Sequence, residues 1–116
     1  MQIIFGTESA NELRQRYTVL ELEEMTIPET DEQPSKTVVA YCVVPAEKIS
    51  LEELPIIDNW VKLHEDFLNG YKTQQYDYCT QCIEHLMGKF GGELDTFYEE
   101  ILRRINLELN KNSSAV

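Results

Sequence analysis

A chain of 116 residues, 42% of them hydrophobic, is long enough to bury the core of one domain without disulfides or a structural metal. Its 21 acidic and 10 basic side chains leave a formal net charge of −11, which repels the phosphates of nucleic acids and anionic membranes and argues against direct binding to either. No apolar run reaches the roughly 20 residues that cross a bilayer. A partner protein with a basic surface would be attracted, although such acidity is also typical of proteins whose charge serves solubility alone.

Three cysteines, Cys42, Cys79 and Cys82, are too few and odd in number for a disulfide framework. The first six residues have neither the basic segment nor the small-residue cleavage site of a secretory signal. We therefore predict a cytoplasmic protein whose cysteines are thiols in a reducing compartment.

The first element in the chain is predicted to be a short strand. Residues 2–5 are an apolar run closed by Gly6. Thr7 or Ser9 then has the side chain to cap a short helix over residues 10–17. A strand followed directly by a helix is the expected beginning of the fold.

Residues 18–25 predict a second strand, but the alternation of apolar and polar side chains is uneven. Leu20, Leu22 and Glu24 would share one face, and Met25 would lie on the other with two more glutamates. Neither face is cleanly apolar. The pattern therefore indicates an edge strand or a half-solvated one.

A third strand is predicted over residues 37–44, the most apolar run of the chain and rich in β-branched side chains. The polar segment between Pro28 and Pro34 is predicted to be a loop. Together with residues 18–25, the third strand would form an antiparallel hairpin with a long, mobile tip, and Pro45 would end it.

The second half of the chain predicts helices. Ser50 and Glu53 have the spacing of a capping box. Apolar residues follow helical spacing from Ile56 onward, and the first helix is expected to break near Gly70. A second helix is predicted over residues 75–90.

Gly91 and Gly92 would end that second helix. A third helix is predicted to begin near Glu93, because acidic residues crowd its first turns and Arg103 and Arg104 follow later, as the helix dipole favours. The polar residues 110–116 would form a frayed end.

This order predicts an α+β fold, with a small antiparallel sheet in the N-terminal half packed with a three-helix C-terminal segment. We expect one domain over residues 1–110 and a flexible tail over residues 111–116.

The sequence offers several candidate chemical sites, and each also has a plain structural explanation. Cys79, Cys82 and His85 step by three along one helix, and His64 or Cys42 could complete a metal site, a thiol pair or a Cys–His nucleophile only through tertiary proximity. A second metal-binding pair and an oxyanion loop are missing from the sequence. Packing as small hydrophobic side chains explains the cysteines equally well.

Two further patterns have structural explanations. The glycines of residues 88–92 are too closely spaced for a phosphate-binding loop and suit a turn between helices. Asp95 and Glu99 share a helix face, as an acid–base pair or cation site would require, but the helix dipole already accounts for them. We therefore assign no catalytic residue, no cofactor and no metal ligand, and leave an enzyme as the weaker alternative.

Two resemblances are found, one over residues 56–90 and one that would cover nearly the whole chain. The Trp60-x-x-Leu63 spacing and the helix that follows, within residues 56–90, resemble one tetratricopeptide-type helical hairpin, which implies a packing mode and no function. Residues 17–23 (Tyr-Thr-Val-Leu-Glu-Leu-Glu) and 86–98 (Leu-Met-Gly-Lys-Phe-Gly-Gly-Glu-Leu-Asp-Thr-Phe-Tyr) are similar to segments of small uncharacterised proteins of tailed marine bacteriophages, those of cyanobacteria in particular. That resemblance implies a viral protein in the cytoplasm of an infected bacterium and no particular activity.

The interpretation that accounts for these features is an acidic protein-binding or regulatory accessory protein. Glu29, Asp31 and Glu32 in the hairpin loop would face a basic protein surface. Trp60 and Tyr78 would add aromatic anchors if they are exposed. The alternatives are a structural or assembly homo-oligomer and a small metal- or thiol-dependent enzyme.

Overall fold

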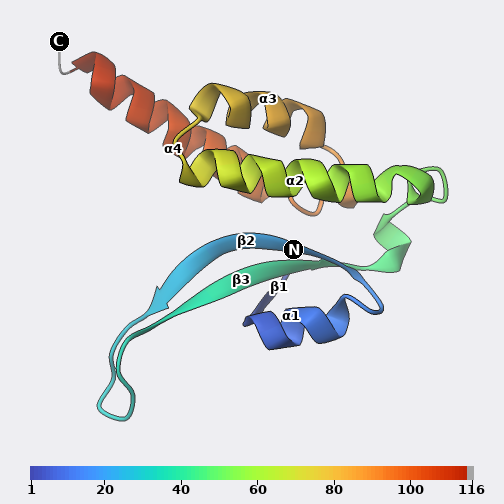
Figure 1. Ribbon diagram of the computed structural model, residues 1–116, viewed down its shortest axis with the longest axis horizontal. Helices are drawn as coiled ribbons and strands as arrows, with labels where there is room; N and C mark the ends of the chain where they lie inside the picture. Colours follow the sequence, from blue (N-terminus) through green and yellow to red (C-terminus); the bar gives the residue numbers. More distant parts are fainter. Residues whose placement is uncertain (115–116) are drawn as a thin grey trace. The chain divides into compact units, whose positions relative to one another are not determined.

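The computed structural model describes residues 1–114, with side chains through residue 111 (Figure 1). Strands come first and helices second, so the predicted α+β class is confirmed. The strand half consists of β1 (Gln2–Phe5), α1 (Thr7–Leu13), β2 (Thr18–Ile27) and β3 (Lys36–Val44). The helical half consists of α2 (Ile57–Lys72), α3 (Tyr76–Leu86) and α4 (Asp95–Ser114).

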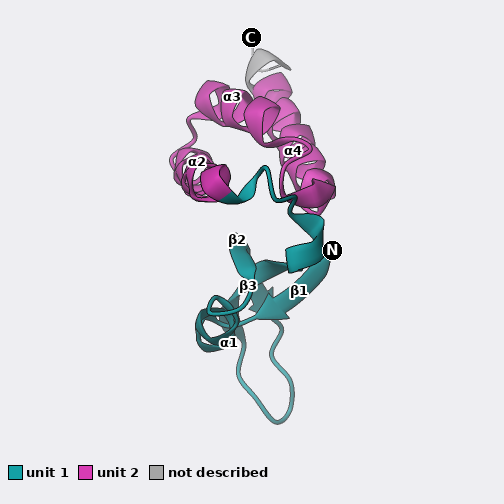
Figure 2. Cartoon of the chain, turned by 90° about the vertical axis from the view of Figure 1, so that its right-hand side faces the viewer, with its two compact units in different colours: residues 1–54 teal, residues 55–116 magenta. Residues whose placement is uncertain are grey.

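The chain forms two compact units, Met1–Leu54 and Pro55–Val116, which Figure 2 shows in different colours. Three 3-10 turns, Ala46–Lys48, Leu54–Ile56 and Phe90–Gly92, lie between the larger elements. No helix within the described residues is long and apolar enough to cross a membrane. The expectation of one domain over residues 1–110 with a flexible tail stays a prediction.

The first unit is a three-stranded antiparallel sheet with α1 on one face. Its strand order is β1-β3-β2, so β3 is central and β2 is an edge strand, in line with the uneven alternation of its sequence. On the face covered by α1, Ala10 packs against Val19, Tyr41 and Val43, all buried. The apolar, β-branched β3 is therefore the strand on which this unit is built.

A β-bulge interrupts the pairing of β2 with β3. Glu21 lies opposite Tyr41, but Glu24 lies opposite Val39, so two β2 residues face one β3 residue in between. The expectation that Glu24 would share a face with Leu20 is therefore wrong. Beyond the bulge, Glu24 lies on the same face as Val39 and Tyr41. One extra residue in a strand moves the side chains that follow it to the opposite face of the sheet.

The predicted cap of α1 is also wrong. Gly6, with φ of 99°, is the N-cap residue, and neither Thr7 nor Ser9 makes a capping hydrogen bond. The Thr7 hydroxyl instead shares a hydrogen bond of 3.1 Å with the Tyr41 hydroxyl. The helix begins directly after β1 because glycine tolerates the left-handed φ needed for this sharp change of direction.

The predicted capping box at Ser50 and Glu53 does not start a helix. The N–H of Glu53 donates to the carbonyl of Ser50 at 3.0 Å, which closes only a turn. α2 begins at Ile57, with Ile56 as its N-cap and no side-chain cap. Pro55 explains the delay, because a helix begun after Ser50 would need a backbone N–H at residue 55, which proline lacks.

The helix boundaries of the second unit differ from the predicted ones. α2 runs through Gly70 and ends at Lys72, and α3 ends at Leu86 before Gly88, which has a φ of 83°. α4 begins at Asp95 and continues past residue 110. Gly70 does not break α2. It allows α3 to pack closely against α2, since a Cβ at this position would lie 3.0 Å from Tyr78 Cδ2 in α3.

The core of the second unit contains an aromatic cluster that joins α2 to α4. His64 and Phe67 on α2 meet Phe97 and Tyr98 on α4, with ring centroids 5.6 to 6.4 Å apart. His64 Nδ1 and the Tyr98 hydroxyl share a hydrogen bond of 2.8 Å, and both side chains are buried. Burial of the imidazole is possible because its ring nitrogen is hydrogen-bonded.

Candidate functional site

The β2–β3 hairpin extends beyond the third strand of the sheet. β1 pairs with β3 only between Ala40 and Val43, and the N–H of Gly6 donates to the carbonyl of Val39 at 3.0 Å. Farther out, residues 24–27 pair with residues 36–39 as a ribbon of two strands. The ribbon carries the loop away from α1 in both views of the chain (Figure 1 and Figure 2).

A tight turn closes the loop at the end of this ribbon. The backbone N–H of Thr30 donates to the carbonyl of Gln33 at 2.8 Å, and the Gln33 N–H donates back to Thr30, to its carbonyl at 3.3 Å and its hydroxyl at 3.1 Å. A threonine side chain at this place stabilises a turn. Asp31 and Glu32 therefore lie at the apex, and residues 28–35 between β2 and β3 form the loop where the sequence predicted it.

The apex carries concentrated negative charge, and we call Glu29, Asp31 and Glu32 the acidic tip. All three side chains are exposed. Among the described residues, no basic side chain forms an ion pair with any of them. Their charge is therefore directed to solvent, where a basic surface could meet it.

The two predicted aromatic contacts lie in the other compact unit. Trp60, on α2, is half-buried beneath Lys89, whose Nζ lies 4.6 Å from the centre of the Trp60 ring. Among the described residues, no acceptor reaches its buried indole N–H. Tyr78, on α3, is 42% exposed, and its pKa is raised, chiefly by its hydrogen bond to Cys82. A hollow of about 250 Å³ adjoins it, lined by Asp66, Asn69, Gly70, Thr73, Gln75 and Tyr78.

The structure therefore gathers three of the five predicted interaction residues, those of the acidic tip. Trp60 is engaged by Lys89 and offers only part of its ring. Tyr78 is accessible, but its role as an anchor stays a prediction. We take the acidic tip as the candidate site.

The cysteines and the histidine of α3 differ in their exposure to solvent. Cys79 and Cys82 are buried, whereas His85 on the same helix is exposed. The Cys79 thiol donates to the carbonyl of Phe67 at 3.5 Å, and burial raises its pKa to about 11, which disfavours the reactive thiolate. Within the described part of the chain, no three His, Cys, Asp or Glu side chains are grouped to hold a metal.

Sequence reasoning missed the pairing of His64 with Tyr98, because the two residues are 34 positions apart and neither has a local signal of the contact. The ion pairs of Glu100 were also missed, because sequence reasoning treated Arg103 and Arg104 only as partners of a helix dipole.

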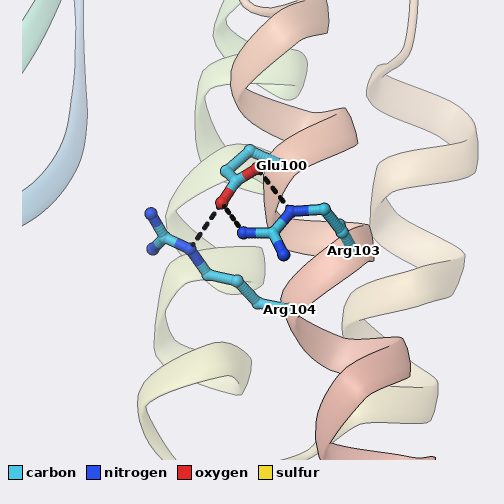
Figure 3. Close-up of polar contacts among 3 residues, drawn as sticks. All are labelled: Glu100, Arg103 and Arg104. Atoms are coloured by element: carbon cyan, nitrogen blue, oxygen red, sulfur yellow. Dashed lines mark hydrogen bonds and ion pairs between the residues drawn. The ribbon is translucent and has the colours of Figure 1, made fainter.

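Figure 3 shows both guanidinium groups directed at Glu100, with Nε–oxygen distances of 2.9 and 3.2 Å. Hydrogen bonding, first from Arg103, lowers the pKa of Glu100 to about 2. This spacing of three and four residues along a helix is the signal that could have found it.

No family model, curated protein or solved structure matches this chain.

Proposed function

We propose that this chain is an acidic protein-binding accessory module that presents its hairpin to a basic surface of a partner protein. The observation that carries the proposal is the acidic tip: three exposed carboxylates within four residues, held at the apex of a projecting two-stranded ribbon. The similarity to bacteriophage proteins would place this activity in the cytoplasm of an infected bacterium, a reducing compartment that suits the three buried thiols.

The physical role of such a tip is to steer association. Exposed charges add little affinity in water but raise the rate of encounter with a surface of opposite sign. Their reach is about one Debye length, roughly 8 Å at physiological ionic strength. A projecting tip brings its charge near a partner before the sheet of its own unit does, so the partner meets the ribbon before that sheet.

The test begins with capture of a partner from bacterial lysate, followed by association kinetics with the purified partner. The tip variant combines Glu29→Gln, Asp31→Asn and Glu32→Gln, which leaves the Thr30–Gln33 turn intact. A matched control combines Glu8→Gln, Glu12→Gln and Glu52→Gln, all on exposed side chains of the same unit. Both variants change the net charge from −11 to −8.

We expect the association rate constant of the tip variant to fall about tenfold at low salt, and that of the control by less than about twofold. The wild-type rate constant should also fall as ionic strength rises. Equal slowing in both variants would mean that net charge alone steers association and would refute the role of the tip. A wild-type rate constant insensitive to salt would refute the electrostatic mechanism.

A further inference from the structure

The two edges of the sheet differ in how they are protected. β2, at one edge, carries Glu21, Glu23 and Glu24 and is interrupted by the bulge. Charged side chains and bulges are the usual means of preventing a further strand from joining an edge. β1, at the other edge, has none of them: residues 1–7 include no acidic or basic side chain, in a chain whose net charge is −11.

The pairing of β1 with β3 determines which of its backbone groups face outward. The N–H of Gly6 donates to the carbonyl of Val39, so Gly6 points toward β3. Backbone groups in an antiparallel strand alternate in direction, so Ile4 also points inward, whereas the N–H and C=O groups of Ile3 and Phe5 point away from β3. Within residues 1–114, no further strand pairs with this edge. The Ile3 and Phe5 side chains are 44% and 54% exposed.

We infer that the outer edge of β1 pairs with the β1 edge of a second copy of this chain. An antiparallel pairing about a two-fold axis at Ile4 places Ile3 of each copy opposite Phe5 of the other. This register forms four backbone hydrogen bonds and two apolar cross-strand contacts, since residues of equal parity lie on one face. The same patch serves both partners, as two-fold symmetry requires.

The charge pattern selects a second copy as the occupant. A basic partner gains no ion pair from β1, because the strand has no acidic side chain. A second copy brings an equally uncharged strand. Two chains of net charge −11 therefore meet at a surface where neither has a charged side chain to repel the other. The contact is short, well below the roughly 1,200 Å² of a standard interface, so we expect a dissociation constant between about 10 µM and 1 mM.

Sedimentation equilibrium of the full chain, from 1 µM to about 1 mM, tests the inference. The average mass of the wild type should rise from that of one chain toward that of two. Higher salt should strengthen the dimer, because it screens the repulsion between two acidic chains. This sign is opposite to that expected for the acidic tip, whose neutralised variant should dimerise at least as well as the wild type, so the two proposals fail separately.

Two variants test the register. Ile3→Lys and Phe5→Glu should each weaken the dimer at least tenfold. A mixture of the two should restore association, because position 3 of one variant lies opposite position 5 of the other and forms a Lys–Glu pair. Met25→Lys, on the opposite edge strand and 44% exposed, is the matched control and should dimerise like the wild type.

Hydrogen exchange of backbone amides tests the pairing without any variant, so the result does not depend on whether the substituted proteins fold. The Ile3 and Phe5 amides should exchange more slowly at 1 mM than at 10 µM. A wild type that stays monomeric at 1 mM would overturn the inference. So would loss of the dimer in Met25→Lys but not in the β1 variants, a mixture that fails to restore association, or Ile3 and Phe5 exchange that is independent of concentration.

Discussion

Removal of the Tyr98 hydroxyl should destabilise the helical unit. Tyr98 is fully buried, and its hydroxyl shares a 2.8 Å hydrogen bond with Nδ1 of His64, which is 1% exposed. Tyr98→Phe keeps the ring contacts with Phe67 and deletes that bond. Loss of a partner for a buried polar group costs about 1–3 kcal/mol. For 116 residues, the unfolding entropy makes this a fall in Tm of about 4–12 °C.

The assay is urea and thermal unfolding followed by circular dichroism. The matched control is Tyr17→Phe, which removes a hydroxyl from a ring that is 40% exposed and should change stability by less than about 0.5 kcal/mol. A double-mutant cycle with His64→Leu should give a coupling energy of about 1 kcal/mol between the two side chains. A Tyr98→Phe protein within about 0.5 kcal/mol of the wild type would refute the reasoning, because the hydrogen bond would then carry no net stability.

Three further perturbations follow from the helical unit. Gly70→Ala should destabilise by about 1 kcal/mol in urea unfolding, since a Cβ 3.0 Å from Tyr78 Cδ2 outweighs the gain in helix propensity, and Tyr78→Ser should shrink that loss. Glu100 has a folded pKa of about 2, below its ordinary 4.5, so its contribution is present above pH 4.5 and lost as pH falls toward 2. The stability difference between wild type and Glu100→Gln should therefore narrow over that window, and a constant difference would contradict the pairing with Arg103. Iodoacetamide at pH 8 should leave the buried Cys79 thiol unmodified in the native protein and label it in urea, whereas rapid native labelling would contradict its raised pKa.

Sequence patterns predicted the elements of this fold better than their ends. β3 was predictable because a run of β-branched apolar residues has few alternatives to a buried strand. Helical spacing from Ile56 indicated the start of α2 to within one residue, whereas the capping-box spacing at Ser50 was misleading, because Pro55 overrides that local signal. Gly70 was misjudged because a glycine that breaks a helix and one that permits close packing look alike until the neighbouring helix is in place.

The candidate site was predictable for a related reason. The acidic tip is local, so the prolines and acids of its own segment indicated an exposed loop. The direction of the β1 backbone groups and the partners of His64 depend on residues more than 30 positions away. Short-range patterns contain no information about such contacts. The sequence therefore predicted the presence of the loop, but it did not predict which distant residues pair with one another.

The bulge in β2 has an evolutionary consequence. It already accommodates one extra residue between Glu21 and Glu24, while the residues on either side remain paired with β3. A deletion of Glu23 should therefore leave a plain ladder, with the outer ribbon still paired as it is now. Changes in the length of the gene at this point could alter the twist and aim of the hairpin without a shift of the strands that build the core. The arm that carries the acidic tip can thus diversify separately from the sheet that supports it.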